Sequence, residues 1–261
     1  MSFIGSAWDQ LSIVGRILGF LWLLEMISVP VWKWLFGERA ERLAISAGVL
    51  LQVSLVVSIL LPAWGVPRTL VVWLAVSGLG WLSELIGSRT GIPYGPYTYT
   101  AVLQPQFFRV PVVVPLAWMM MMPPAWAVGA SISGLFSLPS GGWLLAVLGA
   151  LAFTSWDLFL DPQMVSWDFW RWHTKGGYFG IPWLNYAGWF IVAALITFVV
   201  QPVNLPFEPL LLVFLLTWLL QTIAQLFFWK LPGPAIAGFF GMGIFGGLSL
   251  LFWTFSNGTL P

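Results

Sequence analysis

The chain has 261 residues, of which 59% are hydrophobic and only 7% are charged, and its formal net charge is +1. Soluble globular domains usually carry about 25% charged residues, so this chain has too little polar surface for a water-soluble fold. It contains no cysteine, which excludes disulfides, thiolate metal ligands and cysteine nucleophiles. The composition predicts an all-α, polytopic integral membrane helical bundle, which we expect to be a single transmembrane domain over residues 1–261.

Apolar runs of about 20 residues, separated by charged or Pro/Gly-rich breaks, mark the segments that can cross a membrane. The first run shows no small-residue cleavage pattern, so we interpret it as a membrane span rather than a cleaved signal. The sixth run is short, which leaves seven spans as the alternative count. The eight predicted spans are residues 11–35, 43–63, 68–88, 110–137, 141–162, 186–201, 208–230 and 234–255.

The positive charges favour one side of this arrangement. The four odd-numbered connections between spans hold eight basic residues, whereas the opposite side holds two, Arg16 and Arg68. Because cytoplasmic loops are enriched in Lys and Arg, we expect a multi-pass protein of the cell membrane with its odd-numbered connections in the cytoplasm and both termini outside. The eight residues are Lys33, Arg39, Arg42, Arg89, Arg109, Arg171, Lys175 and Lys230.

Four of the nine acidic residues sit inside stretches that are otherwise apolar enough to cross a membrane: Glu25, Glu84, Asp157 and Asp161. A carboxyl group at membrane depth is costly unless it is protonated, paired or facing a polar cavity, so each one marks a candidate functional site. Asp157 and Asp161 are four residues apart, which places both on one face of a helix. Two ionised neighbours would repel each other. One of them is therefore expected to hold a proton near neutral pH and to be a candidate general acid.

Two of the predicted cytoplasmic connections, residues 87–100 and 161–186, are rich in Gly, Pro and aromatic residues. The first directly follows Glu84, and the second follows the aspartate pair. Both contain a Gly-Ile-Pro-aromatic-x-x-Tyr pattern, beginning at Gly91 and Gly180, which is either an internal repeat or a convergent feature of two interfacial loops. Because both loops begin on the face that carries the carboxyls, we expect them to converge on one cavity.

Four motifs follow one another in the chain: Glu84, Gly91-Ile-Pro-Tyr-Gly-Pro-Tyr-Thr-Tyr99, Asp157-x-x-x-Asp161-Pro162 and Trp170-x-x-x-x-x-Gly176-Gly-Tyr-Phe-Gly-Ile-Pro-x-x-Asn185-Tyr-x-Gly-Trp189. Together they resemble the CruF family of membrane carotenoid biosynthesis proteins. These are carotenoid 1,2-hydratases, which include bisanhydrobacterioruberin hydratases and γ-carotene 1′,2′-hydratases. The resemblance covers about residues 80–190 and is a match of hydropathy alone elsewhere.

The resemblance implies a hydro-lyase that works without a cofactor and adds water to the terminal C1=C2 double bond of an acyclic carotenoid ψ-end. The implied substrates are lipid-soluble carotenoids of the lycopene, γ-carotene or C50 bisanhydrobacterioruberin type. Membrane lipid and a downstream carotenoid glycosyltransferase are the other expected partners, and no nucleic acid is expected.

Hydration of an isolated alkene requires an acid that protonates C2 and a water that captures the tertiary cation at C1. We expect one aspartate to supply the proton, with Asp161 slightly favoured over Asp157, and Glu84 to accept a proton from the water, although the roles could be reversed. Aromatic faces can stabilise the cation. One histidine and no cysteine cannot form the usual transition-metal site, so no metal is expected. The predicted substrate-binding residues are Tyr94, Tyr97, Trp156, Trp167, Tyr178 and Asn185.

Other interpretations of the same residues stay open. A proton-coupled transporter would use the buried acids as a relay. Asp157-x-x-x-Asp161 also resembles the second metal motif of intramembrane prenyltransferases of the UbiA family, although the chain lacks the first motif of that family. His173 is either an interfacial residue or a proton relay. The structural alternatives are ion pairs from the aspartates to Arg171 or Lys175, an ion pair from Glu84 to Arg89, and a buried hydrogen bond from Glu25 to Gln52 or to another helix.

Overall fold

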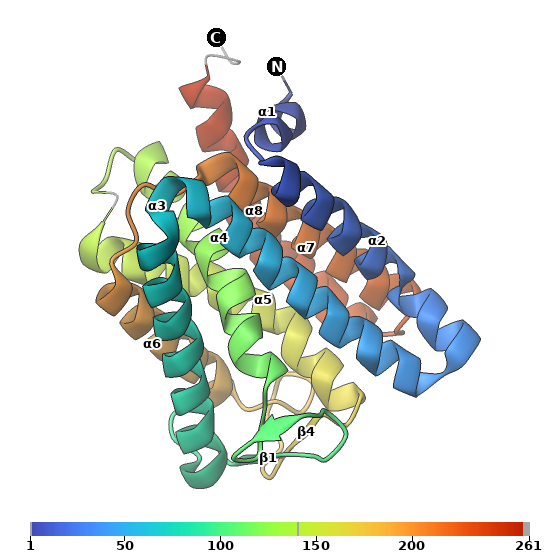
Figure 1. Ribbon diagram of the computed structural model, residues 1–261. Helices are drawn as coiled ribbons and strands as arrows, with labels where there is room; N and C mark the ends of the chain where they lie inside the picture. The colour runs from blue at the N-terminus through green and yellow to red at the C-terminus, as the bar shows by residue number, and fades with distance from the viewer. Residues whose placement is uncertain (1, 140, 258–261) are drawn as a thin grey trace.

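The computed structural model describes residues 2–139 and 141–257 and shows a bundle of long helices with two small two-stranded sheets (Figure 1). The helix α1 and the end of α8 lie at one end of the bundle, and β1 and β4 lie at the other. The prediction of an all-α polytopic membrane fold is confirmed. The helices are α1 (Phe3–Asp9), α2 (Ile13–Phe36), α3 (Glu38–Thr90), α4 (Val113–Leu135), α5 (Gly142–Ser166), α6 (Trp183–Val200), α7 (Phe207–Phe227) and α8 (Pro232–Ser256), and the strands are β1 (Tyr97–Tyr99), β2 (Gln106–Phe107), β3 (Val110–Pro111) and β4 (Trp170–Trp172).

Seven helices in the described ranges are long and apolar enough to cross a membrane. The longest, α3, has 53 residues and would extend about 80 Å at 1.5 Å per residue, whereas a bilayer core is about 30 Å thick. It is interrupted at Gly65, whose φ of 69° and ψ of 168° are not helical, between Pro62 and Pro67. The chain folds back at this point (Figure 1), so α3 provides two crossings. Seven apolar helices therefore correspond to the eight predicted spans.

The centre of the bundle is α4, which contacts α3, α5, α7 and α8. Its middle turns are filled by large side chains, of which Trp118, Met119, Met121 and Met122 are fully buried. Methionine side chains adapt to irregular gaps between helices, so the side chains of α4 fill the space between the helices around it. Glycine allows close approach on both sides of α4: Gly80 of α3 lies against Trp118, and Gly129 of α4 lies against Gly149 of α5.

The two aromatic loops meet in one antiparallel sheet. Strand β1 pairs with β4 in a register that places Tyr97 opposite Trp172 and Tyr99 opposite Trp170. Successive side chains of a strand point to opposite faces, so these four aromatic residues share one face of the sheet. We call this two-stranded sheet the aromatic ribbon. The shared Gly-Ile-Pro pattern has different structural outcomes, because it leads into β1 after Gly91 and into α6 after Gly180, which favours convergence over a repeat.

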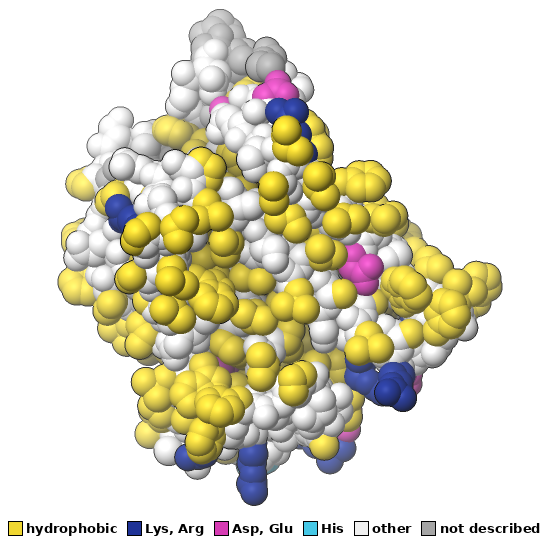
Figure 2. All heavy atoms as spheres, in the orientation of Figure 1, with side chains coloured by type: hydrophobic (Ala, Val, Ile, Leu, Met, Phe, Trp, Pro, Cys, Tyr) yellow, Lys and Arg dark blue, Asp and Glu magenta, His cyan; other side chains and the backbone are white. Residues whose placement is uncertain are grey.

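The surface matches a bundle with its flank in lipid. Figure 2 shows hydrophobic side chains over the flank and most Lys and Arg side chains near its lower edge, where Figure 1 places the aromatic ribbon. The orientation of this end towards the cytoplasm stays a prediction.

The close approach of α4 and α5 gives a testable prediction. A Cβ atom added at Gly129 would lie 2.7 Å from the backbone N of Gly149. Because a backbone atom cannot swing aside, we expect Gly129→Ala to lower the free energy of unfolding by about 1–3 kcal/mol, seen as a lower thermal unfolding temperature in detergent. Gly78→Ala is the matched control, since its added atom meets nothing within 4 Å. Equal unfolding temperatures for the two variants would contradict this packing.

Candidate active site

The two aspartates of α5 meet one asparagine of α6. The Nδ2 atom of Asn185 donates to Asp157 Oδ2 at 2.7 Å and to Asp161 Oδ2 at 2.6 Å. All three side chains are buried, with exposed fractions of 2% or less. The spacing of four residues therefore places both carboxyls on one face of α5, and a single amide bridges them.

The two carboxyls differ in their other partners. The indole nitrogens of Trp170 and Trp172 donate to Asp161 Oδ1 at 2.6 and 3.2 Å, so Asp161 accepts three hydrogen bonds. Asp157 Oδ1 is buried and has no hydrogen-bond partner among the described residues. A negative charge is thus better stabilised on Asp161 than on Asp157.

Glu84 of α3 is held by the other strand of the aromatic ribbon. The hydroxyl groups of Tyr97 and Tyr99 donate to Glu84 Oε2 at 2.5 and 2.8 Å. The strand β1 thus supplies the donors for Glu84, and β4 supplies those for Asp161. The ribbon holds carboxyls from two different helices at one end of the bundle.

No positive charge pairs with these three carboxyls in the described part of the chain. The ion pairs there join Arg16 to Asp9, Lys33 to Glu41, Arg42 to Glu38 and Arg171 to Asp168. The structural alternatives that paired the aspartates with Arg171 or Lys175, and Glu84 with Arg89, are therefore not realised. Hydrogen bonds from Arg171 lower the pKa of the exposed Asp168 instead.

Two further sequence alternatives concern Glu25 and His173. The amide nitrogen of Gln52 lies 3.2 Å from Met121 Sδ and 3.3 Å from Thr217 Oγ1, and it does not bond Glu25. His173 is exposed beside the ribbon, where its ring contacts the Thr98 hydroxyl at 3.3 Å. Neither Glu25 nor His173 lines the cavity described next.

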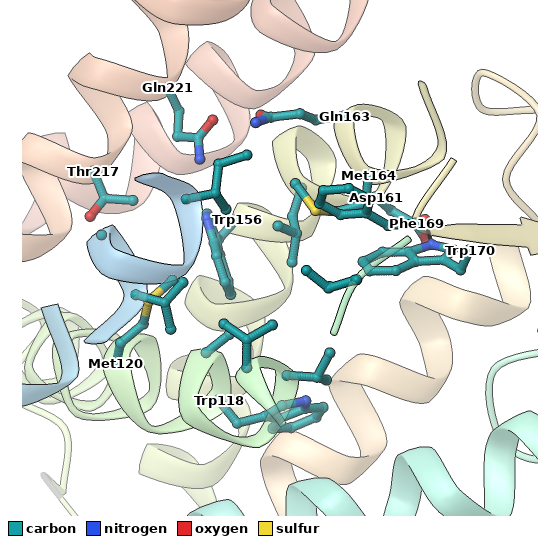
Figure 3. Close-up of a pocket in the computed structure, with 18 of the residues that line it drawn as sticks. Trp118, Met120, Trp156, Asp161, Gln163, Met164, Phe169, Trp170, Thr217 and Gln221 are labelled. Carbon is teal, nitrogen blue, oxygen red and sulfur yellow. Dashed lines mark hydrogen bonds between the residues drawn. The ribbon is translucent and has the colours of Figure 1, made fainter. Parts of the chain in front are cut away.

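A cavity extends from the carboxyls into the bundle and offers about 120 Å³ to the centres of water-sized molecules. Its walls are mostly apolar and aromatic. Figure 3 shows Asp161 and Trp170 on one side, Thr217 and Gln221 on the other, and Trp156 between them. Residues from α3, α4, α5, α6, α7 and the ribbon contribute, including Glu84, Asp161, Asn185, Trp118, Trp156 and Trp189.

The cavity separates the predicted site residues into two groups. Asp161, Glu84, Tyr94, Tyr97, Trp156 and Asn185 line it. Asp157 lies behind, bonded to Asn185, and Trp167 packs against Trp229, which does line the cavity. Tyr178 lies in a separate small core and donates to the backbone oxygen of Leu158, so it does not reach the cavity wall.

Tyr99, Trp170 and Trp172 are site residues that the sequence motifs did not predict. The sequence signal for them is the alternation in Tyr-Thr-Tyr and Trp-Arg-Trp, which is the period of a strand with one face buried. A group of polar residues on the helices also lines the cavity without having been predicted as site residues: Gln52, Gln163, Thr217 and Gln221.

The ribbon tyrosines give a prediction about pH. Burial, and secondly the negative charge of Glu84, raises the pKa of Tyr94, Tyr97 and Tyr99 well above the ordinary value of 10.0. The folded protein therefore retains more protons than the unfolded chain above about pH 10, so its stability falls as the pH rises. We expect tyrosinate ultraviolet absorbance to appear only together with unfolding, and Tyr97→Phe to weaken the fall in unfolding temperature. Ionisation of these tyrosines near pH 10 in the folded protein would contradict this.

The chain has relatives among known proteins. A family model described as "Carotenoid biosynthesis protein" matches residues 45–244, a range that includes all three carboxyls. The chain is also 34% identical over 109 residues to the bisanhydrobacterioruberin hydratase of Haloarcula japonica. That alignment covers 41% of this chain and 36% of the relative, so about a third of the relative's length is matched. No solved structure matches the chain. The family match covers most of the sequence and confirms the resemblance, so this chain belongs to the family of carotenoid biosynthesis proteins.

Proposed function

We propose that this protein adds water to the terminal C1=C2 double bond of an acyclic carotenoid ψ-end and produces a 1-hydroxy-1,2-dihydro carotenoid. The observation that carries the proposal is one apolar cavity with Asp161 and Glu84 on its wall, each on a different helix and each held by donors from the ribbon. Family membership and the name of the Haloarcula relative support it.

The substrate in this proposal is a linear carotenoid of the lycopene, γ-carotene or C50 bisanhydrobacterioruberin type, which enters the cavity with one end. An aromatic wall suits such a hydrocarbon. Trp118 and Trp189 stack with ring centroids 5.0 Å apart, and Trp156 meets Trp189 edge to face at 6.1 Å. The product is a tertiary alcohol, which a carotenoid glycosyltransferase could use next.

Asp161 is the proton donor in the first step. It lines the cavity, whereas Asp157 lies behind it, and two neighbouring carboxyls without a cation are expected to keep one proton between them. This proton rests on Asp157, whose carboxylate has fewer donors, and it reaches the alkene through Asp161. The alkene π electrons form the new C–H bond at C2, the O–H bond of Asp161 breaks, and a tertiary cation remains at C1. Asn185, Trp170 and Trp172 then stabilise the carboxylate that is left.

Glu84 is the proton acceptor in the second step. It already accepts two hydrogen bonds at Oε2, an arrangement that suits a carboxylate. Water adds to C1, the C–O bond forms, and the proton released from the water passes to Glu84. Until then the faces of nearby tryptophans stabilise the cation by cation–π attraction of about 2 kcal/mol or more. Both steps use only side chains and water, so no cofactor is part of the proposal.

Expression in cells that accumulate lycopene tests the activity directly. We expect the extracted pigment to gain the mass of one water for each modified end, because each ψ-end presents one terminal alkene. The same cells without the protein are the control. If lycopene and a C50 acyclic precursor are both recovered unchanged, the hydratase proposal is wrong and the transporter alternative gains support.

Removing the proton-carrying groups should abolish the reaction without unfolding the protein. Asp161→Asn, Asp157→Asn and Glu84→Gln are each expected to lower the hydration rate by about a hundredfold or more, since general acid–base groups contribute that much. Quenching of tryptophan fluorescence by lycopene should show that the variants still bind it. Asp168→Asn, at the exposed partner of Arg171, is the control and should keep the wild-type rate. Wild-type turnover in all three carboxyl variants would refute these assignments.

A further inference from the structure

A second polar group lines the cavity away from the carboxyls. It consists of Gln52 of α3, Gln163 of α5, and Thr217 and Gln221 of α7, which we call the glutamine cluster. All four are buried, with exposed fractions between 1% and 8%. Figure 3 shows Thr217 and Gln221 across the cavity from Trp170, and Gln163 between Gln221 and Met164.

The glutamine cluster has unused hydrogen-bonding capacity. The carboxamide of Gln221 makes no hydrogen bond within the described residues, and its Oε1 atom is fully buried. Gln163 Oε1 accepts from Gln225 at 2.9 Å, but the amide nitrogen of Gln163 has no partner in the same part of the chain. A buried carbonyl oxygen without a partner is costly, so this pattern points to a ligand that both donates and accepts.

Water fits these requirements and a carotenoid hydrocarbon does not. A buried water typically makes about three hydrogen bonds to otherwise unsatisfied groups and needs about 10–15 Å³ for its centre. The 120 Å³ of the cavity is therefore ample for several waters beside these side chains. The cluster supplies carbonyl acceptors, amide donors and one hydroxyl within an otherwise apolar wall.

We propose that the glutamine cluster binds water and supplies the molecule that captures the carotenoid cation. This rests on the proposed hydratase function and adds the source of its second reactant. The cluster and the carboxyls line the same cavity, and α5 carries Gln163 only two residues after Asp161. A water released from Gln221 forms the C–O bond at C1, and the proton that it loses passes through neighbouring cavity waters to Glu84.

The supply of water to the cation can be measured from the products, because the cation either captures water or loses a proton again. In deuterated buffer the acid adds deuterium to C2. Capture by water then gives a deuterated alcohol. If capture is slow, the cation loses a proton again, either the original hydrogen of C2 or one from a C1 methyl group, and the recovered alkene carries deuterium at C2. The ratio of labelled alkene to alcohol, read by mass spectrometry with lycopene as the substrate, therefore reports water capture separately from protonation.

Gln221→Leu should raise this ratio about tenfold, the effect of losing about one hydrogen bond to the water, while lycopene still quenches tryptophan fluorescence. Gln221→Asn keeps a carboxamide and should recover part of the loss. Two threonines of α7 give a matched pair. Thr217 lines the cavity, whereas Thr222 is buried elsewhere and bonds its own helix at Trp218, so Thr217→Val should raise the ratio and Thr222→Val should not.

The outcomes separate the two proposals. A wild-type protein that hydrates lycopene, with wild-type ratios in Gln221→Leu and Thr217→Val, would overturn the water site and leave the hydratase function intact. A wild-type protein that neither labels nor hydrates any acyclic carotenoid would overturn both. Should Gln221→Leu fail to fold, the Thr217→Val and Thr222→Val pair decides the question.

Discussion

The structure depends on keeping three carboxyl groups inside a membrane bundle without a cation beside them. Burying such groups is expensive, and hydrogen bonding is what makes it tolerable. Here the donors are two tyrosine hydroxyls for Glu84, and two indole nitrogens and one amide for Asp161. Neutral donors stabilise a carboxylate by hydrogen bonding, but they do not hold it permanently ionised as a cationic partner would. A lysine or arginine in their place would hold each group ionised and prevent it from cycling its proton. In the proposed hydratase, the aromatic donors would therefore suit the proton transfers as well as the apolar surroundings.

The aromatic ribbon explains why two distant loops must fold together. Its strands are joined in a fixed register, so a side chain on β1 has a defined position relative to one on β4. Glu84 on α3 and Asp161 on α5 are thus placed by one small sheet rather than by helix packing alone. The same four rings form part of the cavity wall, so one element both orients the acids and limits water at that end. Close glycine contacts at α4 then keep the helices that carry the acids near enough for the ribbon to reach both.

Much of this could be predicted from sequence because the signals are local. Hydropathy gave the spans, including two within α3, since apolar length and a Gly/Pro break are features of a single segment. The spacing of Asp157 and Asp161 gave their shared face for the same reason. The ribbon could not be predicted, because pairing Tyr97 with Trp172 depends on contacts between distant parts of the chain. For the same reason Tyr178 could not be told apart from Tyr97: both lie in aromatic loops, and only the tertiary fold turns one away from the cavity. Gln221 is not part of a recognisable motif, and the sequence around a single glutamine in an apolar helix does not reveal which way its side chain faces.

The separation between carboxyls and glutamine cluster is consistent with the order of events that hydration requires. Protonation of an alkene needs an acid that is not surrounded by water. Bulk water is a stronger base than the alkene, so it would take the proton instead. Capture of the cation then needs water at once, before the proton is lost again. In the proposed hydration, a cavity with Asp161 on one side, Gln221 on the other and tryptophan faces between them would meet both needs, because a carotenoid end bound there would lie between the acid and the water. The apolar wall would then do more than bind the substrate. It would set the order of proton transfer and water addition by determining what the cation meets first.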